Sequence, residues 1–115
     1  MAAKAITAKD YFTNLVEYTG STLTAVNDWM EVPAQSPSYT FAATVTGGAN
    51  FTLALECSFN GTSWFTIDSS KTINSNGEYV YFYDSKPAAQ VRMRIASILS
   101  GIPNVLPHIA VVYEG

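Results

Sequence analysis

The sequence predicts an all-β protein: a single-domain antiparallel β-sandwich, of the jelly-roll or immunoglobulin-like (Ig-like) kind, with about seven or eight strands. Apolar and polar residues alternate along most of the chain, which is the period of half-buried strands. Clusters of Gly, Asn, Ser and Pro separate these runs every 8 to 12 residues or so, as expected of turns between short strands. The 115 residues suffice for one self-supporting core, and no helical period extends beyond about two turns.

The N-terminal end lacks this alternation. Residues 1–10 are small and weakly amphipathic, and they are too few to form a stable helix in water. We therefore expect an N-terminal arm over residues 1–10 and a β-sandwich domain over residues 11–115. Within the domain, residues 11–19 and 29–32 are each consistent with a strand, whereas residues 20–26 show no clear pattern.

The clearest alternation lies in residues 38–46 and 51–59. The first run places four apolar residues on one face: Tyr39, Phe41, Ala43 and Val45. Residues 47–50 read Gly-Gly-Ala-Asn, a turn signal, so a hairpin between the two runs is the expected connection.

Four further strands follow from turn signals and alternation. Asn60-Gly61 is the strongest short turn signal, because type I′ turns need positive φ at both central positions. It precedes a strand at residues 63–68. The later strands are expected at residues 78–83, 90–98 and 107–113, with Arg92 and Arg94 on the polar face of the second of these.

The residues that carry chemistry are few. His108 is the only histidine, whereas a zinc site needs three or four ligands held together. Cys57 is the only cysteine and falls in phase with apolar neighbours, so we expect a small buried hydrophobe rather than a reactive thiol. We expect His108 to be a buried or edge residue. A pair of carboxylates brought together by the fold, as in a glycan hydrolase, has no support in the sequence, where solvation on polar faces explains the acids. The sequence thus predicts no catalytic residue, no cofactor and no metal, in a protein that is not an enzyme.

The net charge and its distribution limit the classes of partner that we expect. Six Lys and Arg residues against nine Asp and Glu give a net charge of −3, and the cations are scattered, so no nucleic-acid partner is expected. No apolar run approaches the length of a membrane span, and the N-terminus lacks the apolar region of a secretion signal. We therefore expect no membrane association and synthesis in a reducing cytosol. Only 13% of the residues are charged, which suits either a surface packed against other proteins or a neutral β-domain of the extracellular type.

The strand at residues 78–83 has apolar or aromatic side chains on both faces. One face must point inward, and the other must be covered or left as an apolar patch of the kind that marks protein contacts. Together with the arm and its junction, this predicts an interface formed by Ile6, Tyr11, Phe12, Tyr79, Tyr81 and Tyr83. The alternative is a sugar-binding face built from these tyrosines with Trp29 and Trp64, although Trp64 is more simply expected in the core.

Two segments resemble a β-module of tailed-bacteriophage virion proteins. They are residues 55–67, LECSFNGTSWFTI, and residues 90–95, QVRMRI, with an Asn76-Gly77 turn between them. The same pattern occurs in head decoration proteins, in neck and tail components, and in adhesion domains. It covers about 45 of the 115 residues.

The resemblance implies a non-enzymatic virion structural protein. The most specific role that it implies is capsid decoration, in which a cement protein stabilises the phage head by bridging capsid subunits as a symmetric homo-oligomer, with a trimer favoured. The implied partners are the major capsid protein or other virion proteins, and the implied location is the virion, after synthesis in the host cytoplasm. The alternatives are a carbohydrate-binding or receptor-binding module of a tail or fibre, and a neck or tail component.

Overall fold

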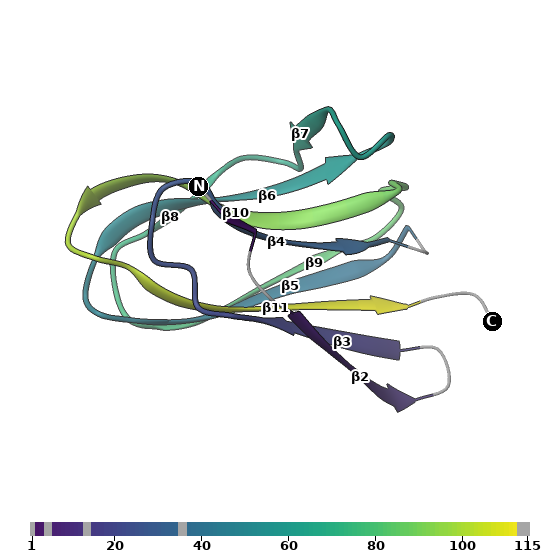
Figure 1. The fold of residues 1–115 in the computed structure, drawn as a ribbon, viewed down its shortest axis with the longest axis horizontal. Helices are drawn as coiled ribbons and strands as arrows, with labels where there is room; N and C mark the ends of the chain where they lie inside the picture. Colours follow the sequence, from purple (N-terminus) through teal and green to yellow (C-terminus); the bar gives the residue numbers. More distant parts are fainter. Residues whose placement is uncertain (1, 4–5, 13–14, 35–36, 113–115) are drawn as a thin grey trace.

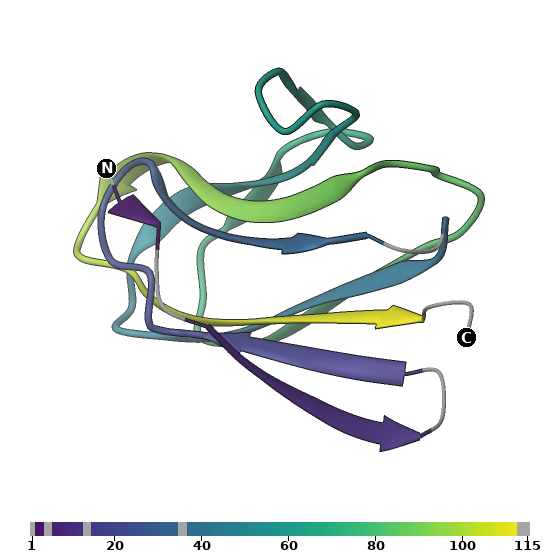
Figure 2. The same ribbon diagram turned by 45° about the vertical axis from the view of Figure 1, so that its right-hand side comes forward.

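The computed structural model describes residues 2–3, 6–12, 15–34 and 37–112. It confirms the predicted all-β sandwich: two sheets, of six and five strands, face each other across one core (Figures 1 and 2). All strand pairs are antiparallel except the short parallel pairing of β1 with β4. None of the residues that the structure places form a helix of the length and apolarity needed to cross a lipid bilayer.

The described residues form eleven strands. In chain order they are β1 (Ala2–Ala3), β2 (Ile6–Phe12), β3 (Leu15–Gly20), β4 (Asp28–Pro33), β5 (Tyr39–Thr46), β6 (Asn50–Ser58), β7 (Trp64–Thr66), β8 (Lys71–Ile73), β9 (Gly77–Tyr83), β10 (Gln90–Ser100) and β11 (Asn104–Val112). The number exceeds the prediction because β1 and β8 are only two and three residues long, too short to leave an alternation. In addition, the segment expected as one strand at residues 11–19 divides between β2 and β3.

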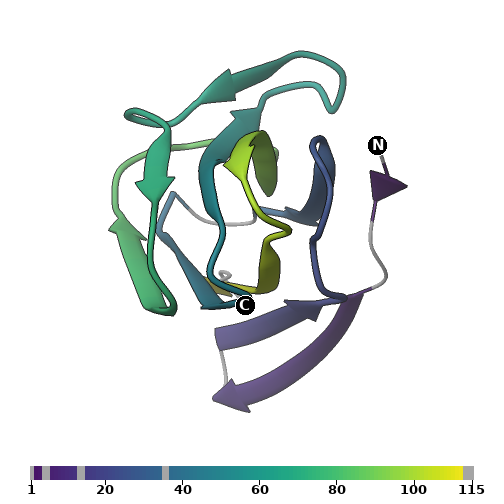
Figure 3. The ribbon, with the colours of Figure 1, turned by 90° about the vertical axis from the view of Figure 1, so that its left-hand side faces the viewer.

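Each sheet is built around a strand from the C-terminal quarter of the chain. The order in the first sheet, sheet A, is β1-β4-β10-β6-β7, and β8 also pairs with β6. The order in the second, sheet B, is β2-β3-β11-β5-β9. The central strands are therefore β10 and β11, and Figure 3 shows β2 and β9 on opposite sides of sheet B.

The expected N-terminal arm is instead part of the sheets. Ala2 and Ala3 pair with β4, and β2 pairs with β3 from Ile6 opposite Gly20 to Phe12 opposite Leu15. The boundary predicted between residues 10 and 11 thus falls inside β2. Edge pairing requires only backbone hydrogen bonds, so it leaves little trace in the side-chain pattern from which the arm was predicted.

The expected hairpin between β5 and β6 is also wrong, because the two strands lie in different sheets. The chain crosses from sheet B to sheet A through Gly47 and Gly48, whose φ angles are 94° and 68°. Ala49 follows and is buried, with only 1% of its surface exposed. A connection between two sheets and a hairpin within one need the same glycines and the same alternation, so the sequence pattern does not distinguish them.

The core is filled from the faces that the alternation predicted. Leu53 and Leu55 of β6, and Val91, Met93 and Ile95 of β10, have no exposed surface. The residues predicted on the inner face of β5 are likewise buried: Tyr39, Phe41, Ala43 and Val45. Leu23 belongs to residues 20–26, where the sequence shows no clear pattern. It is fully buried and forms an isolated bridge to Val105, which the sequence did not predict.

Candidate interaction surfaces

The described neighbours of His108 do not have the arrangement of a Ser-His-Asp triad. Its Nδ1 lies 3.2 Å from the Thr19 hydroxyl and 3.5 Å from a Glu17 carboxylate oxygen, so both neighbours share one ring nitrogen. A general base of the triad type uses one nitrogen toward the nucleophile and the other toward the acid. His108 is half-buried on the central strand β11, not on an edge. Among the described residues, no group of three His, Cys, Asp or Glu side chains is arranged to hold a metal ion.

Cys57 is half-buried and packs against the core. Burial, with a smaller contribution from the negative charge of Glu56, raises the pKa of its thiol. The thiolate is the reactive form of cysteine, so this environment disfavours chemistry at the sulfur.

Two carboxylates are buried where solvation was expected: Asp28, which is 3% exposed, and Glu56. Glu56 of β6 is only 5% exposed. Its Oε1 accepts hydrogen bonds from Nε of Arg92 at 2.7 Å and from Nε of Arg94 at 3.0 Å. Burial favours a higher pKa for Glu56, but the hydrogen bonds from Arg94 and Arg92 outweigh it and hold the pKa below its usual value. The carboxylate is therefore a fixed anion that joins two strands of sheet A.

The two tryptophans lie outside the core, one on each side of Arg92. The guanidinium carbon of Arg92 is 4.1 Å from the Trp64 ring centroid and 5.8 Å from that of Trp29. The indole nitrogen of Trp29 donates to Glu31 at 2.8 Å. The core position expected for Trp64 is thus wrong. Arg92 therefore contacts both tryptophan rings.

The predicted interface residues divide between the two edges of sheet B. Tyr79, Tyr81 and Tyr83 of β9 are half-buried and turn inward against the core. The outward side chains of β9 are Val80 and Phe82, which are 48% and 78% exposed. The apolar patch that the sequence predicted on this strand is therefore present, but the tyrosines are its inner face.

The other three predicted residues belong to β2, at the opposite edge of the sheet. Ile6 is 39% exposed. The side chains of Tyr11 and Phe12 lie outside the part of the chain that the structure describes. The fold does not bring Ile6 and the tyrosines of β9 together.

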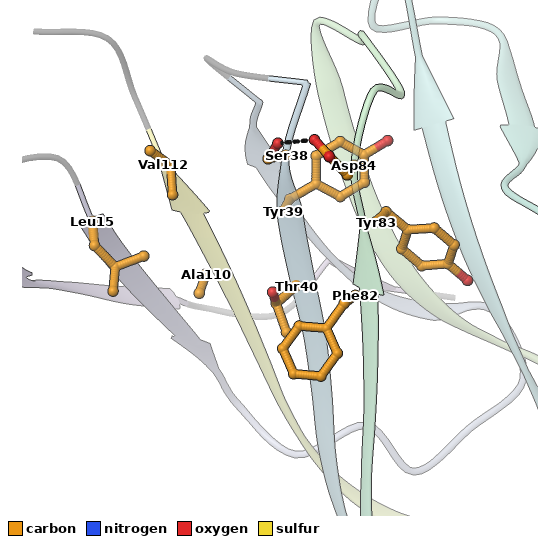
Figure 4. Close-up of a pocket in the computed structure, with 9 residues that line it drawn as sticks. All are labelled: Leu15, Ser38, Tyr39, Thr40, Phe82, Tyr83, Asp84, Ala110 and Val112. Carbon is orange, nitrogen blue, oxygen red and sulfur yellow. Dashed lines mark hydrogen bonds between the residues drawn. The ribbon is translucent and has the colours of Figure 1, made fainter.

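A shallow groove of about 350 Å³ runs along the outer face of sheet B (Figure 4). Phe82 stands on one side of it, and Leu15 and Val112 stand on the other, with Thr40 and Ala110 between them. At one end the Ser38 hydroxyl donates to Asp84 at 2.6 Å. The groove is mostly apolar, with the polar groups of Ser38 and Asp84 at one end.

A second exposed aromatic cluster lies at the β6–β7 end of sheet A. Phe59 and Phe65 are 65% and 52% exposed, and their ring centroids are 5.6 Å apart. Phe59 also lines a cavity of about 410 Å³ with Asp68, Ser85 and Lys86 among its polar residues. Asp68 and Ser85 both have positive φ, at 63° and 59°. No sequence pattern indicated this cavity, because its residues come together only when the β7–β8 and β9–β10 connections meet.

No protein-family model and no curated protein sequence matches this chain. Its fold is similar to that of the C-terminal carbohydrate-binding module CBM6 of LamC, a marine laminarinase from Zobellia galactanivorans, with a TM-score of 0.48 and 10% identity over 92% of this chain and 87% of the other. It is also similar to the CBM22-1–GH10 modules of the Clostridium thermocellum endo-1,4-β-D-xylanase 10B, solved with xylohexaose, with a TM-score of 0.45 and 12% identity over 97% of this chain. The match spans only 25% of the xylanase chain. A CBM4 structure gives a TM-score of 0.36 and 12% identity over 93% of this chain and 74% of the other.

Proposed function

We propose that the protein is a non-enzymatic structural protein of a tailed-bacteriophage virion, and that it binds the head as a decoration protein that bridges capsid subunits. The observation that carries the proposal is the exposure of large apolar side chains at separate places on a chain with few charges. The most exposed are Leu99 at 86%, Phe82 at 78%, Ile102 at 75% and Phe59 at 65%. Exposed apolar groups of this size mark surfaces that other proteins cover.

The segment that resembles the virion module builds one of these surfaces. In the β6–β7 connection, the Ser58 hydroxyl accepts from the Gly61 amide at 2.8 Å. The Asn60 side-chain oxygen accepts from the amides of Thr62 and Ser63 at 2.8 and 2.9 Å. These bonds fix a loop longer than the two-residue turn that Asn60-Gly61 suggested. The fixed loop presents Phe59 and Phe65 beside each other.

The second surface lies at the other end of the same sheet. Ser100 of β10 pairs with Asn50 at the start of β6, whereas Gln90 pairs with Ser58 at its end. Leu99 and Ile102 are therefore one strand length from Phe59, roughly 25 to 30 Å for nine residues. Two apolar contact points at this separation would let one molecule touch two capsid subunits, so that individually weak contacts act at high effective concentration.

Cosedimentation with capsids tests the proposal. Shells of the encoding phage, prepared without this protein, should bind the wild-type chain and become more resistant to heat. The double variants Phe59→Ser/Phe65→Ser and Leu99→Ser/Ile102→Ser should each bind less, because each removes one of two contact points. Val26→Ser is a matched control, since Val26 is also exposed, at 42%, but belongs to neither surface. If the wild-type chain fails to bind the shells, or if both double variants bind as well as it does, the proposal is wrong.

Carbohydrate binding is the second candidate, and the Phe59 cavity is the observation that favours it. The exposed rings of Phe59 and Phe65 offer an apolar surface, and Asp68, Ser85 and Lys86 supply polar groups beside it. A glycan array followed by calorimetry should then identify a ligand whose binding is lost in Phe59→Ala and kept in Leu99→Ala. Capsid binding requires both surfaces, whereas glycan binding requires only this one.

A further inference from the structure

We infer that β9 is a docking edge, and that it pairs with β9 of a second copy of this chain, antiparallel and across a two-fold axis. Among the described residues, β9 pairs only with β5, and it lies at the end of sheet B (Figure 3). All of its seven residues are exposed or half-buried. A further strand would therefore have to pair on its outer side.

The other described edges carry the features that protect edge strands from pairing. In sheet A, β1 has two residues and β7 and β8 have three each, too short to serve as a template. At the far edge of sheet B, β2 contains Lys9 and has a register shift between Asp10 and Phe12. Bulges and lysines are two of the ways in which natural proteins block edge pairing.

The β9 edge lacks these features. Its register with β5 runs without a shift over seven pairs, from Val45 opposite Gly77 to Tyr39 opposite Tyr83. The strand contains no Lys, Arg or Pro, and five consecutive residues, Tyr-Val-Tyr-Phe-Tyr, are of the types enriched in strands. A long, flat and apolar edge of this kind either has a partner or is a liability for aggregation.

Charge favours a second copy in the antiparallel sense. Glu78 is the only charged residue in β9. A two-fold pairing centred on Val80 places Glu78 opposite the partner's Phe82 and separates the two Glu78 carboxylates by about 13 Å along the strands. A parallel pairing would set the two acids side by side, which is destabilising.

The same register gives favourable neighbours on both faces. On the outer face, Val80 meets the partner's Val80 at the axis, and on the inner face Tyr79 meets the partner's Tyr81. Apolar and aromatic cross-strand pairs of this kind stabilise an antiparallel sheet. The two five-stranded sheets would join into one and leave no free β9 edge, so the assembly closes as a dimer.

The expected dimer is weak. Pairing over seven residues buries less than the roughly 800 Å² per partner of a standard interface, so association should depend on concentration in the micromolar range. A two-fold contact makes dimers, in contrast to the trimer that the sequence resemblance favoured. The pairing does not rest on the proposed function, because it concerns the free protein in the absence of capsids.

Sedimentation velocity from roughly 1 to 500 μM tests the inference, a range chosen for a small interface. The wild-type chain should pass from monomer to dimer. Val80→Lys and Val80→Glu should each dimerise about tenfold more weakly or worse, because like charges would meet at the axis. An equimolar mixture of the two variants should restore the dimer, since Lys and Glu would then face each other. Thr66→Lys, an exposed position on the short edge strand β7, is the matched control and should dimerise as the wild-type chain does.

Hydrogen exchange of the wild-type chain tests the inference without any variant. The amides of β9 should become more protected from exchange as the protein concentration rises, and those of β7 should not. Four results would each overturn the inference. The wild-type chain could remain a monomer at the highest concentration or form a trimer. Val80→Lys could dimerise as the wild-type chain does, or the mixture of Val80→Lys and Val80→Glu could fail to restore the dimer. Because these measurements contain no capsids, their failure is separate from failure of capsid binding.

Discussion

Arg92 lies over the ring of Trp64, with 4.1 Å between its guanidinium carbon and the ring centroid, while its Nε donates to the buried Glu56 carboxylate. Arg92 belongs to β10, Trp64 to β7 and Glu56 to β6. One side chain thus links three strands of sheet A on their outer side. The contact matters most for β7, which has only three residues of backbone pairing.

Removing this side chain should destabilise the fold. We expect Arg92→Ala to lower the free energy of unfolding by about 2 to 3 kcal/mol, because it removes the contact with the indoles and leaves Glu56 with fewer charged donors. Arg92→Lys should recover part of the loss, since it keeps the charge but not the planar group. Urea denaturation followed by tryptophan fluorescence measures both. Lys86→Ala removes a cation from an exposed position and serves as the control; an equal effect at both sites would contradict the role given to Arg92.

Low pH should lower the stability of the fold through protonation of Glu56. Because the folded state holds the pKa of Glu56 below the usual 4.5, the charged carboxylate stabilises the fold above that pH. This stabilisation should be lost progressively as the pH falls from about 4.5 through the folded-state pKa. Glu56→Gln should be less stable at neutral pH and should show a flatter dependence below pH 4.5 in denaturant titrations. An acid slope that is the same in Glu56→Gln and in the wild-type chain would refute the assignment.

High pH should destabilise the fold through ionisation of Tyr39. Its hydroxyl donates to the Lys86 carbonyl at 2.9 Å. Burial, with smaller effects from Cys57 and Tyr83, raises its pKa from 10.0 to about 12. The unfolded chain therefore ionises this group first, and stability should be complete below pH 10 and fall as the pH rises toward 12. Tyr39→Phe should flatten this slope and cost about 1 kcal/mol at neutral pH through the lost hydrogen bond. Denaturant titrations of both proteins at neutral and at alkaline pH check both effects, and an unchanged slope would exclude Tyr39 as its source.

Two glycines form a matched pair for backbone strain and packing. Gly48 and Gly101 have φ angles of 68° and 77°. A Cβ at Gly48 would meet no atom within 4 Å, whereas one at Gly101 would lie 3.1 Å from Ala49. Gly48→Ala should therefore cost about 1 to 2 kcal/mol from the left-handed backbone alone. Gly101→Ala should cost roughly 1 to 3 kcal/mol more, because Ala49 is buried and has little room to move. Equal melting temperatures for the two variants would show that the contact with Ala49 is not tight.

The sequence predicted the strands that carry a two-residue period over many residues. The inner faces of β5 and β10 follow directly from Phe41 and Val45, and from Val91 and Met93. Burial on one face is a local property of a strand, so local pattern suffices to find it.

What the sequence did not predict depends on partners that are distant in the chain. Glu56 is buried because Arg92 and Arg94 reach it from the neighbouring strand, and Trp64 leaves the core because Arg92 offers it a surface contact. The sequence predicted that β9 carries an exposed apolar patch. It did not predict that the outward residues are Val80 and Phe82 rather than the tyrosines. Which side of a doubly apolar strand faces inward is decided by the opposing sheet.

The central places of β10 and β11 also constrain when the protein can fold during its synthesis. In sheet A, β4 and β6 have no contact across the sheet until β10 lies between them, and β3 and β5 depend in the same way on β11. A ribosome would therefore have made most of the strands before the first sheet can close, and β11 is completed only at Val112. Until then the apolar faces of the earlier strands have no lasting cover. Neither sheet can close before its central strand is made, so folding of the sandwich should begin only after β11 has been synthesised.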